Sequence, residues 1–388
     1  MSIIRVCNVD EEGRFGGPER RIVQVAKALK QHGVDTHVVY PKYDSEKFAQ
    51  ELSKAGISSS TLNITRLSKE KKVLFRYIFF FLIEIYRLCM FFRKHGFDLV
   101  HVNGSYQFKV ALAAKLAGIP VVWHLNDTMM DAIVKKICII IAEYCASGFI
   151  VTGKRVYEYY IRGTSLERKP FCEIQVPVDT TVFDPTHVIP EKKVNQAQGI
   201  KIVTVSGINP TKGLEYFIEM ATNLLRQHND LVFFVAGAEF SSQKKYYEDL
   251  KTLVSEAMLT DNNLKFVGMV DDVPSFLKGA DIFVFTSVSE SGPAAVWEAM
   301  SMGKAIVTTD VGGVPQYIED GVSGFIVPIK DARALSEKVE LLLANPALRQ
   351  KMGTEARSVA QKNLDVTSAA QKHASFYRRI LSLSSSSD

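Results

Sequence analysis

The sequence predicts an α/β fold of two doubly wound domains, each built on a parallel sheet. Three observations predict it. Short runs rich in Val, Ile and Phe alternate with helical stretches along the chain, a pattern typical of parallel sheets buried on both faces. The chain has 388 residues, which is too long for one ordinary hydrophobic core. A polar stretch, residues 184–199, divides the alternating pattern into two series.

We expect a first domain at residues 1–185 and a second at residues 186–365. The strands expected in the first are Ile3–Val9, Thr36–Tyr40, Leu99–Val102, Val121–Leu125 and Phe149–Thr152. Those expected in the second are Ile202–Ser206, Leu231–Ala236, Leu264–Val267, Ile282–Thr286, Ala305–Thr308 and Phe325–Val327. A last helical stretch, residues 366–383, could pack back on the first domain. Because ligands of such folds bind at the carboxyl ends of the strands, we expect two facing domains with a site in the cleft between them.

Composition indicates a globular protein with reduced thiols. Hydrophobic residues make up 47% of the chain and charged residues 23%. The five cysteines are scattered and never spaced as Cys-x-x-Cys, which argues against a disulfide framework or a zinc site. The apolar run at the N-terminus is too short to be a signal peptide. We therefore expect a cytoplasmic location.

Positive charge is concentrated in one segment of the first half. Residues 66–95 contain eight Lys and Arg but two acids, around the run RYIFFFLIEIYRLCMFF. Arg76, Glu84 and Arg87 leave no uncharged stretch near the ~18–20 residues that a spanning helix needs. A basic, aromatic amphipathic helix can lie in a membrane interface, so we expect peripheral contact with an anionic membrane surface. The alternative is a buried helix with a charged edge. Nucleic-acid binding is not expected, because apolar residues dominate the segment.

Residues 280–303 are the most informative segment. An apolar strand, 280–287, leads into a turn, and the pattern predicts a helix of about ten residues after it. Pro293 suits the first helical position and Gly303 the position just past the end. A helix N-terminus carries unpaired N–H groups and partial positive charge, so it can bind a phosphate. The residues expected to form this anion site are Gly292, Pro293, Ala294 and Ala295.

Two carboxylates lie on either side of this helix start. Glu290 is in the turn and Glu298 is in the second helical turn. Carboxylates accept hydrogen bonds and do not donate them, so a pair of them suits the vicinal hydroxyls of a sugar. An anion site next to hydroxyl-binding acids indicates a sugar nucleotide. The alternative is a surface acid at a helix start and a solvated acid in mid-helix.

Other strand-end loops of the second half could complete a nucleotide site. Residues 206–213 form a Gly/Pro turn that contains Gly207 and one cation, Lys212, suited to a diphosphate. An isolated surface lysine is the alternative. Gly237 and Gly268 begin further loops, suited to a base or ribose. The chain contains no Asp-x-Asp, so we expect no metal and no other cofactor, with the diphosphate neutralised by lysine and helix dipoles.

Two loops of the first half are candidates as well. Gly16 and Gly17 precede a helix that opens at about Pro18, and they would allow a ligand to approach the backbone closely. The loop is not G-x-G-x-x-G, which disfavours a nicotinamide dehydrogenase, and an ordinary strand-to-helix turn is the alternative. His124 ends an expected strand, where it could bond a sugar hydroxyl or simply pack. His101 has the weaker case and is expected to pack.

The string SESGPAAVWEAMSMGKAIVTTDVGGVPQYIEDGVSGFIV strongly resembles the retaining GT-B glycosyltransferases of the group 1 family, in particular those of bacterial surface-polysaccharide synthesis. The E-x7-E pair, the PTKG loop, the GGPE loop and His124 match in chain order. The resemblance implies that Glu290 contacts the donor sugar and Glu298 the ribose. It implies that Lys212 neutralises the diphosphate, that His124 lies near the reacting sugar, and that the loop of Gly16 and Gly17 approaches phosphate and acceptor.

One position departs from the family. Many members have an arginine five residues before the lysine, where this chain has Gly207. The phosphate clamp therefore needs another base, and Arg14, Arg20 or Arg21 could supply it.

The resemblance implies a metal-independent retaining enzyme. It would transfer a hexosyl unit from a UDP- or GDP-sugar to a hydroxyl of a lipid-linked or cell-surface glycan such as lipopolysaccharide, at the inner face of the membrane. The second domain would bind the nucleotide sugar and the first the acceptor. Two alternatives remain: a sugar-nucleotide epimerase of similar shape, which would act on the donor alone, and a non-catalytic nucleotide-sugar-binding protein, which Gly207 slightly favours.

Overall fold

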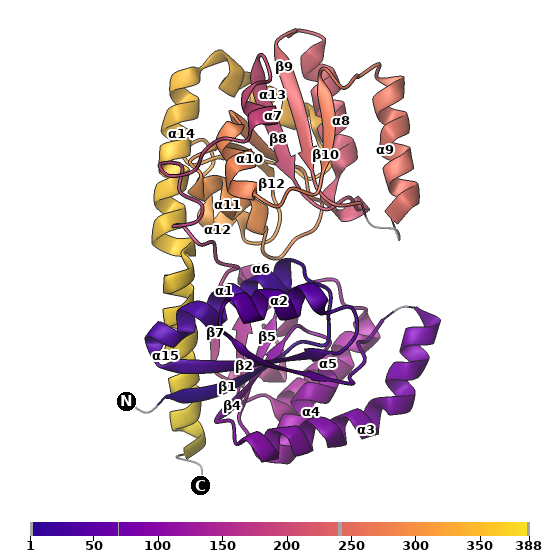
Figure 1. Ribbon diagram of the computed structural model, residues 1–388, viewed down its shortest axis with the longest axis vertical. Coiled ribbons are helices and arrows are strands. Elements are labelled where there is room, and N and C mark those ends of the chain that lie inside the picture. The colour runs from indigo at the N-terminus through magenta and orange to yellow at the C-terminus, as the bar shows by residue number, and fades with distance from the viewer. Residues whose placement is uncertain (1–2, 69, 240–242, 386–388) are drawn as a thin grey trace. The chain divides into compact units, whose positions relative to one another are not determined.

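The computed structural model describes residues 3–68, 70–239 and 243–385, which form two α/β units (Figure 1). The first unit contains the described residues up to Pro177 and those from Val366 onward. The second unit runs from Val178 to Asp365. Each unit has one parallel sheet with helices on both faces, so the predicted fold class is confirmed.

The sheet of the first unit has seven parallel strands in the order β3-β2-β1-β4-β5-β6-β7. Their bounds are β1 Ile4–Val9, β2 Val34–Pro41, β3 Ser58–Leu62, β4 Leu99–Asn103, β5 Val121–Leu125, β6 Gly148–Val151 and β7 Phe171–Glu173. The five expected strands are all present. The sequence did not predict β3 and β7, because they are edge strands: β3 is largely polar and β7 has three residues.

Helices cover both faces of this sheet. They are α1 Gly17–Leu29, α2 Glu46–Lys54, α3 Lys71–His95, α4 Phe108–Ala117, α5 Ala132–Cys145, α6 Lys154–Tyr160 and α15 Val366–Ser385, with short 3₁₀ turns at Lys30–His32 and Ser165–Arg168. Val100 and Val102 of β4 pack in the cluster formed with α3, α4 and α5. Leu99 packs in the opposite cluster with α1 and α15, as the alternation of strand side chains requires.

The helix at the end of the chain is part of the first unit. Ala370, Ala374 and Tyr377 of α15 are buried in the cluster that also contains Leu99. Gly148 at the start of β6 makes room for it, because a Cβ there would lie 2.5 Å from the Cδ1 atom of Ile380. A glycine at this position therefore allows α15 to pack against the sheet.

A buried ion pair joins α3 to α4. The side chains of Lys109 and Glu84 are 0% and 3% exposed, and the Glu84 Oε2 atom accepts hydrogen bonds from Lys109 and from the backbone N–H of Thr65, the latter at 3.0 Å. The Lys109 ammonium also lies 4.1 Å from the ring centroid of Tyr77. The acid inside the apolar run of α3 is thus held in the core.

We expect Lys109→Met to lower the free energy of unfolding by about 3–5 kcal/mol, because it leaves the Glu84 carboxylate buried without its counter-ion. Lys115→Met, on the exposed side of the same helix, should change it by less than about 0.5 kcal/mol. Urea denaturation of the two variants measures the difference. Equal stability of the two would show that the buried pair contributes nothing.

The second unit has a six-stranded parallel sheet in the order β10-β9-β8-β11-β12-β13. The strands are β8 Ile200–Val205, β9 Leu231–Ala236, β10 Leu264–Gly268, β11 Ile282–Phe285, β12 Ala305–Thr309 and β13 Phe325–Val327. The helices are α7 Lys192–Asn195, α8 Leu214–Leu225, α9 Lys244–Glu256, α10 Val273–Gly279, α11 Ala294–Ser301, α12 Val314–Tyr317, α13 Ala332–Ala344 and α14 Pro346–Val359, with a 3₁₀ turn at Pro210–Lys212 and a π-helical turn at Ala360–Leu364. All six expected strands are present.

Two neighbouring residues of β9 show how this sheet is covered. The Phe233 ring packs against Phe217 of α8, with centroids 6.0 Å apart. The Phe234 ring packs against Phe276 of α10, with centroids 6.4 Å apart. Because successive strand residues point to opposite faces, α8 and α10 cover opposite sides of the sheet.

The second unit begins earlier than the sequence predicted, at Val178 instead of residue 186. The Val178 N–H donates to the Leu364 carbonyl at 2.9 Å, and residues 183–185 add further polar contacts. Ser301 donates to the Phe183 carbonyl at 2.8 Å, and Lys278 donates to the Pro185 carbonyl at 2.7 Å. Asp184 forms an ion pair with Arg357 at 3.0 Å. Residues 178–185, which the sequence assigned to the first domain, therefore belong to the second unit.

Candidate active site

The candidate residues of the second unit follow four adjacent strands. Gly207 comes after β8, Gly237 after β9, Gly268 closes β10, and Glu290 follows β11. Because these strands are parallel and neighbours in the sheet, their carboxyl ends meet at one edge. The Gly237 N–H donates to the Gly268 carbonyl at 2.8 Å, which ties two of the loops together.

The backbone of the neighbouring loop requires a glycine at position 237. A Cβ at this position would lie 1.7 Å from the carbonyl oxygen of Ser206, closer than any real contact. The loops after β8 and β9 therefore press against each other. This close approach is sufficient to explain the glycine, even without a base or ribose next to it. Gly268 differs, because it is exposed and has a positive φ of +72°.

Lys212 sits in a turn that is fixed at both ends. The Asn209 side chain accepts from the Thr211 N–H at 3.1 Å and so caps the 3₁₀ turn. Thr286 donates to the Lys212 carbonyl at 2.9 Å, which attaches the turn to the end of β11. Gly213 has φ +59°, and a Cβ on it would meet the Thr286 carbonyl oxygen at 2.4 Å. The lysine therefore projects from a rigid support.

The structure brings Lys212 and Glu290 together. The Lys212 ammonium forms an ion pair with the Glu290 Oε1 atom, and the two side chains are 24% and 15% exposed. Ser287 donates to the same oxygen at 3.4 Å. The expected cation and the expected acid thus form one half-buried charged pair at the carboxyl edge of the sheet, and neither is an isolated surface residue.

The turn before α11 is shaped by a second glycine loop. Gly312 has φ +51°, and a Cβ on it would lie 2.7 Å from the Ser291 carbonyl oxygen and 3.0 Å from that of Glu290. Only glycine allows this approach. The loop after β12 therefore supports the backbone that carries Glu290.

Pro293 does not take the predicted place. It is the N-cap residue of α11, and the helix begins at Ala294. The Ala294 N–H donates back to the Gly292 carbonyl at 2.9 Å, a local turn that delays the first helical residue. At the other end Gly303, with φ +65°, follows the C-cap as predicted.

Few donors of this helix start are left for an anion. The N–H of Ala294 is engaged as described, and those of Val296 and Trp297 donate to the Pro293 carbonyl. Among the residues that the structure describes, Gly292 and Ala295 keep backbone N–H groups without an acceptor. Of the four residues expected to form an anion site, only these two therefore still offer a backbone N–H.

Glu298 is buried in α11, at 8% exposure. The alternative of a solvated mid-helix acid is therefore wrong for this residue. Its position one turn into the helix, after Glu290 and the two free N–H groups, is compatible with the ribose contact that the resemblance implies.

His124 lies at the carboxyl end of β5 in the first unit, where the sequence placed it. It is fully buried, and its Nε2 atom lies 2.9 Å from the Nη1 atom of Arg21. Burial, followed by the charge of Arg21, holds the His124 pKa well below its ordinary value, so the ring is neutral. His101 packs beside it and shares a 2.7 Å hydrogen bond with the Tyr377 hydroxyl, as expected for a structural histidine.

The glycine loop after β1 opens α1 as predicted. Gly16 is the N-cap, and its N–H donates to the Glu19 side chain at 2.7 Å. A Cβ on Gly17 would meet nothing within 4 Å, so this residue is open to a ligand. Arg14 is exposed and paired with Glu12 at 2.9 Å, and the same carboxylate also pairs with Arg66.

Arg21 is one of the three bases that the sequence offers for the phosphate clamp. It is buried, and its Nη1 atom lies next to the Nε2 atom of His124, so it is not an exposed cation. Its signal is visible in the pattern of α1, where the buried face contains Ile22, Val25 and Leu29. A charged residue at a position on the apolar face of a helix indicates a role for that charge.

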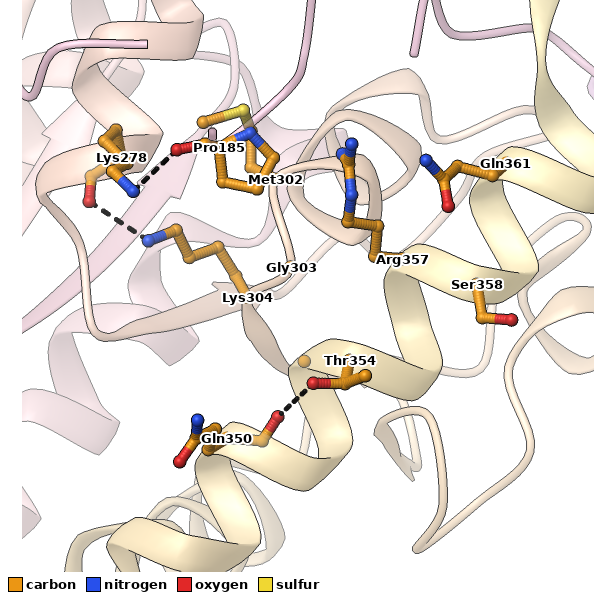
Figure 2. A pocket seen from close by; sticks show the side chains of 11 residues that line it. Pro185, Lys278, Met302, Gly303, Lys304, Gln350, Thr354, Arg357, Ser358 and Gln361 are labelled. Carbon is orange, nitrogen blue, oxygen red and sulfur yellow. Dashed lines mark hydrogen bonds between the residues drawn. The ribbon is translucent and has the colours of Figure 1, made fainter. Parts of the chain in front are cut away.

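A pocket of about 440 Å³ opens elsewhere in the second unit, at the C-terminal end of α11 (Figure 2). Figure 2 shows Lys278 and Lys304 directed at carbonyl oxygens, and Lys304 donates to those of Lys278 and Ala280 at 3.1 and 2.8 Å. Burial lowers the Lys304 pKa to about 8. Lys304 thus stabilises the end of α10, and Lys278 donates to the Pro185 carbonyl. The pocket lies at the opposite end of α11 from Glu290 and contains none of the predicted site residues.

Two family models match the chain. Residues 15–182 match the model described as Glycosyltransferase Family 4. Residues 187–359 match the model described as Glycosyl transferases group 1. The second match contains both acids and the lysine, and the first contains His124 and the glycine loop.

Relatives and solved structures agree with these models. The chain is 25% identical over 379 residues to the N,N'-diacetylbacillosaminyl-diphospho-undecaprenol alpha-1,3-N-acetylgalactosaminyltransferase of Campylobacter jejuni, covering 92% of this chain and 94% of the relative. It is 26% identical over 265 residues to the UDP-Gal:alpha-D-GlcNAc-diphosphoundecaprenol alpha-1,3-galactosyltransferase of Escherichia coli, covering 64% and 66%. The structure of Anabaena HepE in complex with UDP superposes with a TM-score of 0.82 at 19% identity, covering 97% of this chain and 100% of that one.

Proposed function

Because the chain belongs to the group 1 glycosyltransferases and has their GT-B fold, we propose that it is a metal-independent retaining hexosyltransferase. The donor is a nucleoside-diphosphate sugar, with UDP preferred over GDP. The acceptor is a hydroxyl of a lipid-linked glycan. The single observation that carries this proposal is the Lys212–Glu290 pair beside the free N–H groups of Gly292 and Ala295.

The pair is suited to a ligand that is anionic at one end and rich in hydroxyls at the other. A diphosphate would take Lys212 as its counter-ion, helped by the helix start. The Glu290 carboxylate would then accept hydrogen bonds from the hydroxyls of the attached sugar. A nucleoside-diphosphate sugar joins these two chemical groups in one molecule. The names of the Escherichia coli relative and the Anabaena structure support UDP as the nucleotide.

Transfer with retention would proceed in one step at the anomeric carbon. The bond between the anomeric carbon and the diphosphate oxygen breaks, and a bond from the acceptor oxygen forms on the same face of the sugar. The proton of the acceptor hydroxyl passes to an oxygen of the departing diphosphate. Positive charge develops at the anomeric carbon and negative charge on the diphosphate, so Glu290 and Lys212 each stabilise the charge opposite to their own.

A nucleotide screen tests the donor class. Thermal denaturation is measured with UDP, GDP and ADP and then with the corresponding sugars. A ligand at 100 times its dissociation constant stabilises the fold by about 2.7 kcal/mol, so a specific base gives a clear shift. UDP is expected to give the largest. No response to any nucleotide would refute the donor assignment, and turnover of the donor without acceptor would indicate the epimerase instead.

The acceptor proposal rests on α3. Between Phe75 and Met90, seven large apolar side chains of this helix are 44–77% exposed: Phe75, Ile78, Phe79, Leu82, Ile83, Tyr86 and Met90. Exposed Arg76 and Arg87 lie among them. An apolar patch of this extent with interspersed cations suits an anionic membrane surface, where a lipid-linked acceptor is presented. No helix in the described part of the chain is long and apolar enough to cross a membrane.

The other helices of the same layer add to this surface. Ile133, Ile137, Ile140 and Tyr144 of α5 are exposed at helical spacing, and Leu116 is exposed at the end of α4. Both helices pack in the cluster that contains α3. We place the protein at the inner face of the membrane, in peripheral contact through this layer.

We expect the double variant Phe79→Glu with Leu82→Glu to bind anionic vesicles at least ~10-fold more weakly than the native chain, because two apolar side chains lose their burial in lipid and two negative charges are added. Co-sedimentation with phosphatidylglycerol vesicles at low salt measures binding. Leu253→Glu with Leu341→Glu, two exposed leucines of the second unit, is the matched control and should bind normally. If the two double variants bind alike, α3 is not the contact surface.

A further inference from the structure

A chain of hydrogen bonds runs through the carboxyl ends of three adjacent strands in the first unit. Asn103 donates from Nδ2 to the Asn8 Oδ1 atom at 3.1 Å, which fixes the orientation of its amide. Its own Oδ1 atom then accepts from the Nη2 group of Arg21. The Nη1 group of Arg21 lies 2.9 Å from the Nε2 atom of His124. All four side chains line one small cavity of about 10 Å³.

The direction of the last bond follows from the chemistry of arginine. A guanidinium has donors only and stays protonated in proteins. Arg21 must therefore donate to His124, and the Nε2 atom must present its lone pair. A neutral imidazole with an accepting Nε2 carries its proton on Nδ1. The tautomer of His124 is thus set by Arg21.

One group of this cluster is unusual for a merely structural role. The charge of the buried Arg21 is balanced by the nearby carboxylates of Asp10 and Glu19. The Nδ1 atom of His124, however, is buried with no hydrogen-bond partner in the described residues. A buried donor without an acceptor costs stability. Native proteins keep such groups at functional sites, where the missing partner is supplied by something other than the fold.

We propose that Arg21 is a positioning residue that fixes His124 as an Nδ1–H donor for an oxygen of the bound substrate, and that it strengthens this donor by withdrawing electron density through Nε2. The inference rests on the proposed function, because it assigns His124 to that reaction. Arg21 would also be a source of positive potential in the first unit, in a protein that has Gly207 where many family members have an arginine. His124 is then an electrophilic donor and not a general base.

The tautomer is tested first, without any need for activity. Nitrogen-15 spectra of histidine-labelled protein report which ring nitrogen carries the proton, and His124→Gln identifies its signals among the eight histidines. His124 is expected to be neutral with the proton on Nδ1 throughout pH 6–8, with Arg21, His101 and His373 as the charged or titratable groups around it. Arg21→Met should lose this preference. Arg21→Lys, which still donates to Nε2, should keep it. Protonation of Nε2 in the native chain, or an unchanged tautomer in Arg21→Met, would overturn the proposal.

The kinetic test separates positioning from folding. Arg21→Met is expected to lower kcat by ~10–100-fold with little change in the KM of the donor, as for other residues that orient a catalytic group. Arg21→Lys should recover most of the loss, and Lys27→Met, exposed on the same helix, should behave as the native chain. A loss in Arg21→Lys equal to that in Arg21→Met would contradict the role. If no glycosyl transfer is found at all, the spectra still decide the tautomer.

Discussion

Lys212→Ala is expected to lower the turnover of glycosyl transfer by at least ~100-fold while leaving the fold intact. The structure places this ammonium at the carboxyl edge of the second sheet, paired with Glu290, which is followed by the free N–H groups of Gly292 and Ala295. This chain has Gly207 at the position where many family members have an arginine. Lys212 therefore bears more of the leaving-group charge than it would with a second base beside it.

Steady-state transfer from the donor chosen by the nucleotide screen measures this effect. Lys251→Ala, an exposed lysine of α9, is the matched control and should keep full turnover. A second readout is the affinity for UDP, which should fall with the lost charge. Native turnover in Lys212→Ala would refute the assignment of the phosphate clamp, since no other half-buried cation is ion-paired with Glu290 in the described residues.

Glu290→Ala is expected to lower the turnover of glycosyl transfer by at least ~100-fold, as Lys212→Ala does. The carboxylate is held by Lys212 and Ser287, and Gly312 approaches its backbone closely. In the proposed reaction it would therefore be preorganised for a sugar hydroxyl and for the positive charge at the anomeric carbon. The fold should survive, because the side chain is half-buried and at the end of a turn.

Glu290→Gln refines the test by keeping the shape and removing the charge. It should retain nucleotide binding but lose turnover, because the amide still accepts a hydrogen bond and does not stabilise a cation. Glu337→Gln, an acid 60% exposed on α13, is the matched control. Full turnover in Glu290→Gln would show that the negative charge is not used in the reaction.

The sequence predicted the central strands because they are buried on both faces and therefore read as continuous apolar runs. It missed β3 because its residues Ser58–Leu62 are mostly polar, as an edge strand permits. The domain boundary was placed too late because Asp184 and its neighbours are polar, and composition does not reveal that they contact Ser301, Lys278 and Arg357.

For the candidate site, too, the sequence predicted some features and not others. Spacing along the chain identified Glu290, Glu298 and Lys212, because each follows a strand or starts a helix and its type suits the ligand. Spacing did not give the contact between Lys212 and Glu290, which depends on β8 and β11 being neighbours in the sheet. Nor did it give the contacts of Arg21, because its partners Asn103 and His124 lie on strands far from it in the sequence.

The configuration of the product tests most directly whether this chain transfers a sugar with retained configuration. The purified protein is incubated with the α-configured UDP-sugar that it binds and a lipid-diphosphate-linked acceptor, and the anomeric configuration of the new linkage is read by NMR. An α-linked product that is absent with Lys212→Ala is the predicted result. A β-linked product, or release of free sugar with no linkage formed, would contradict the account.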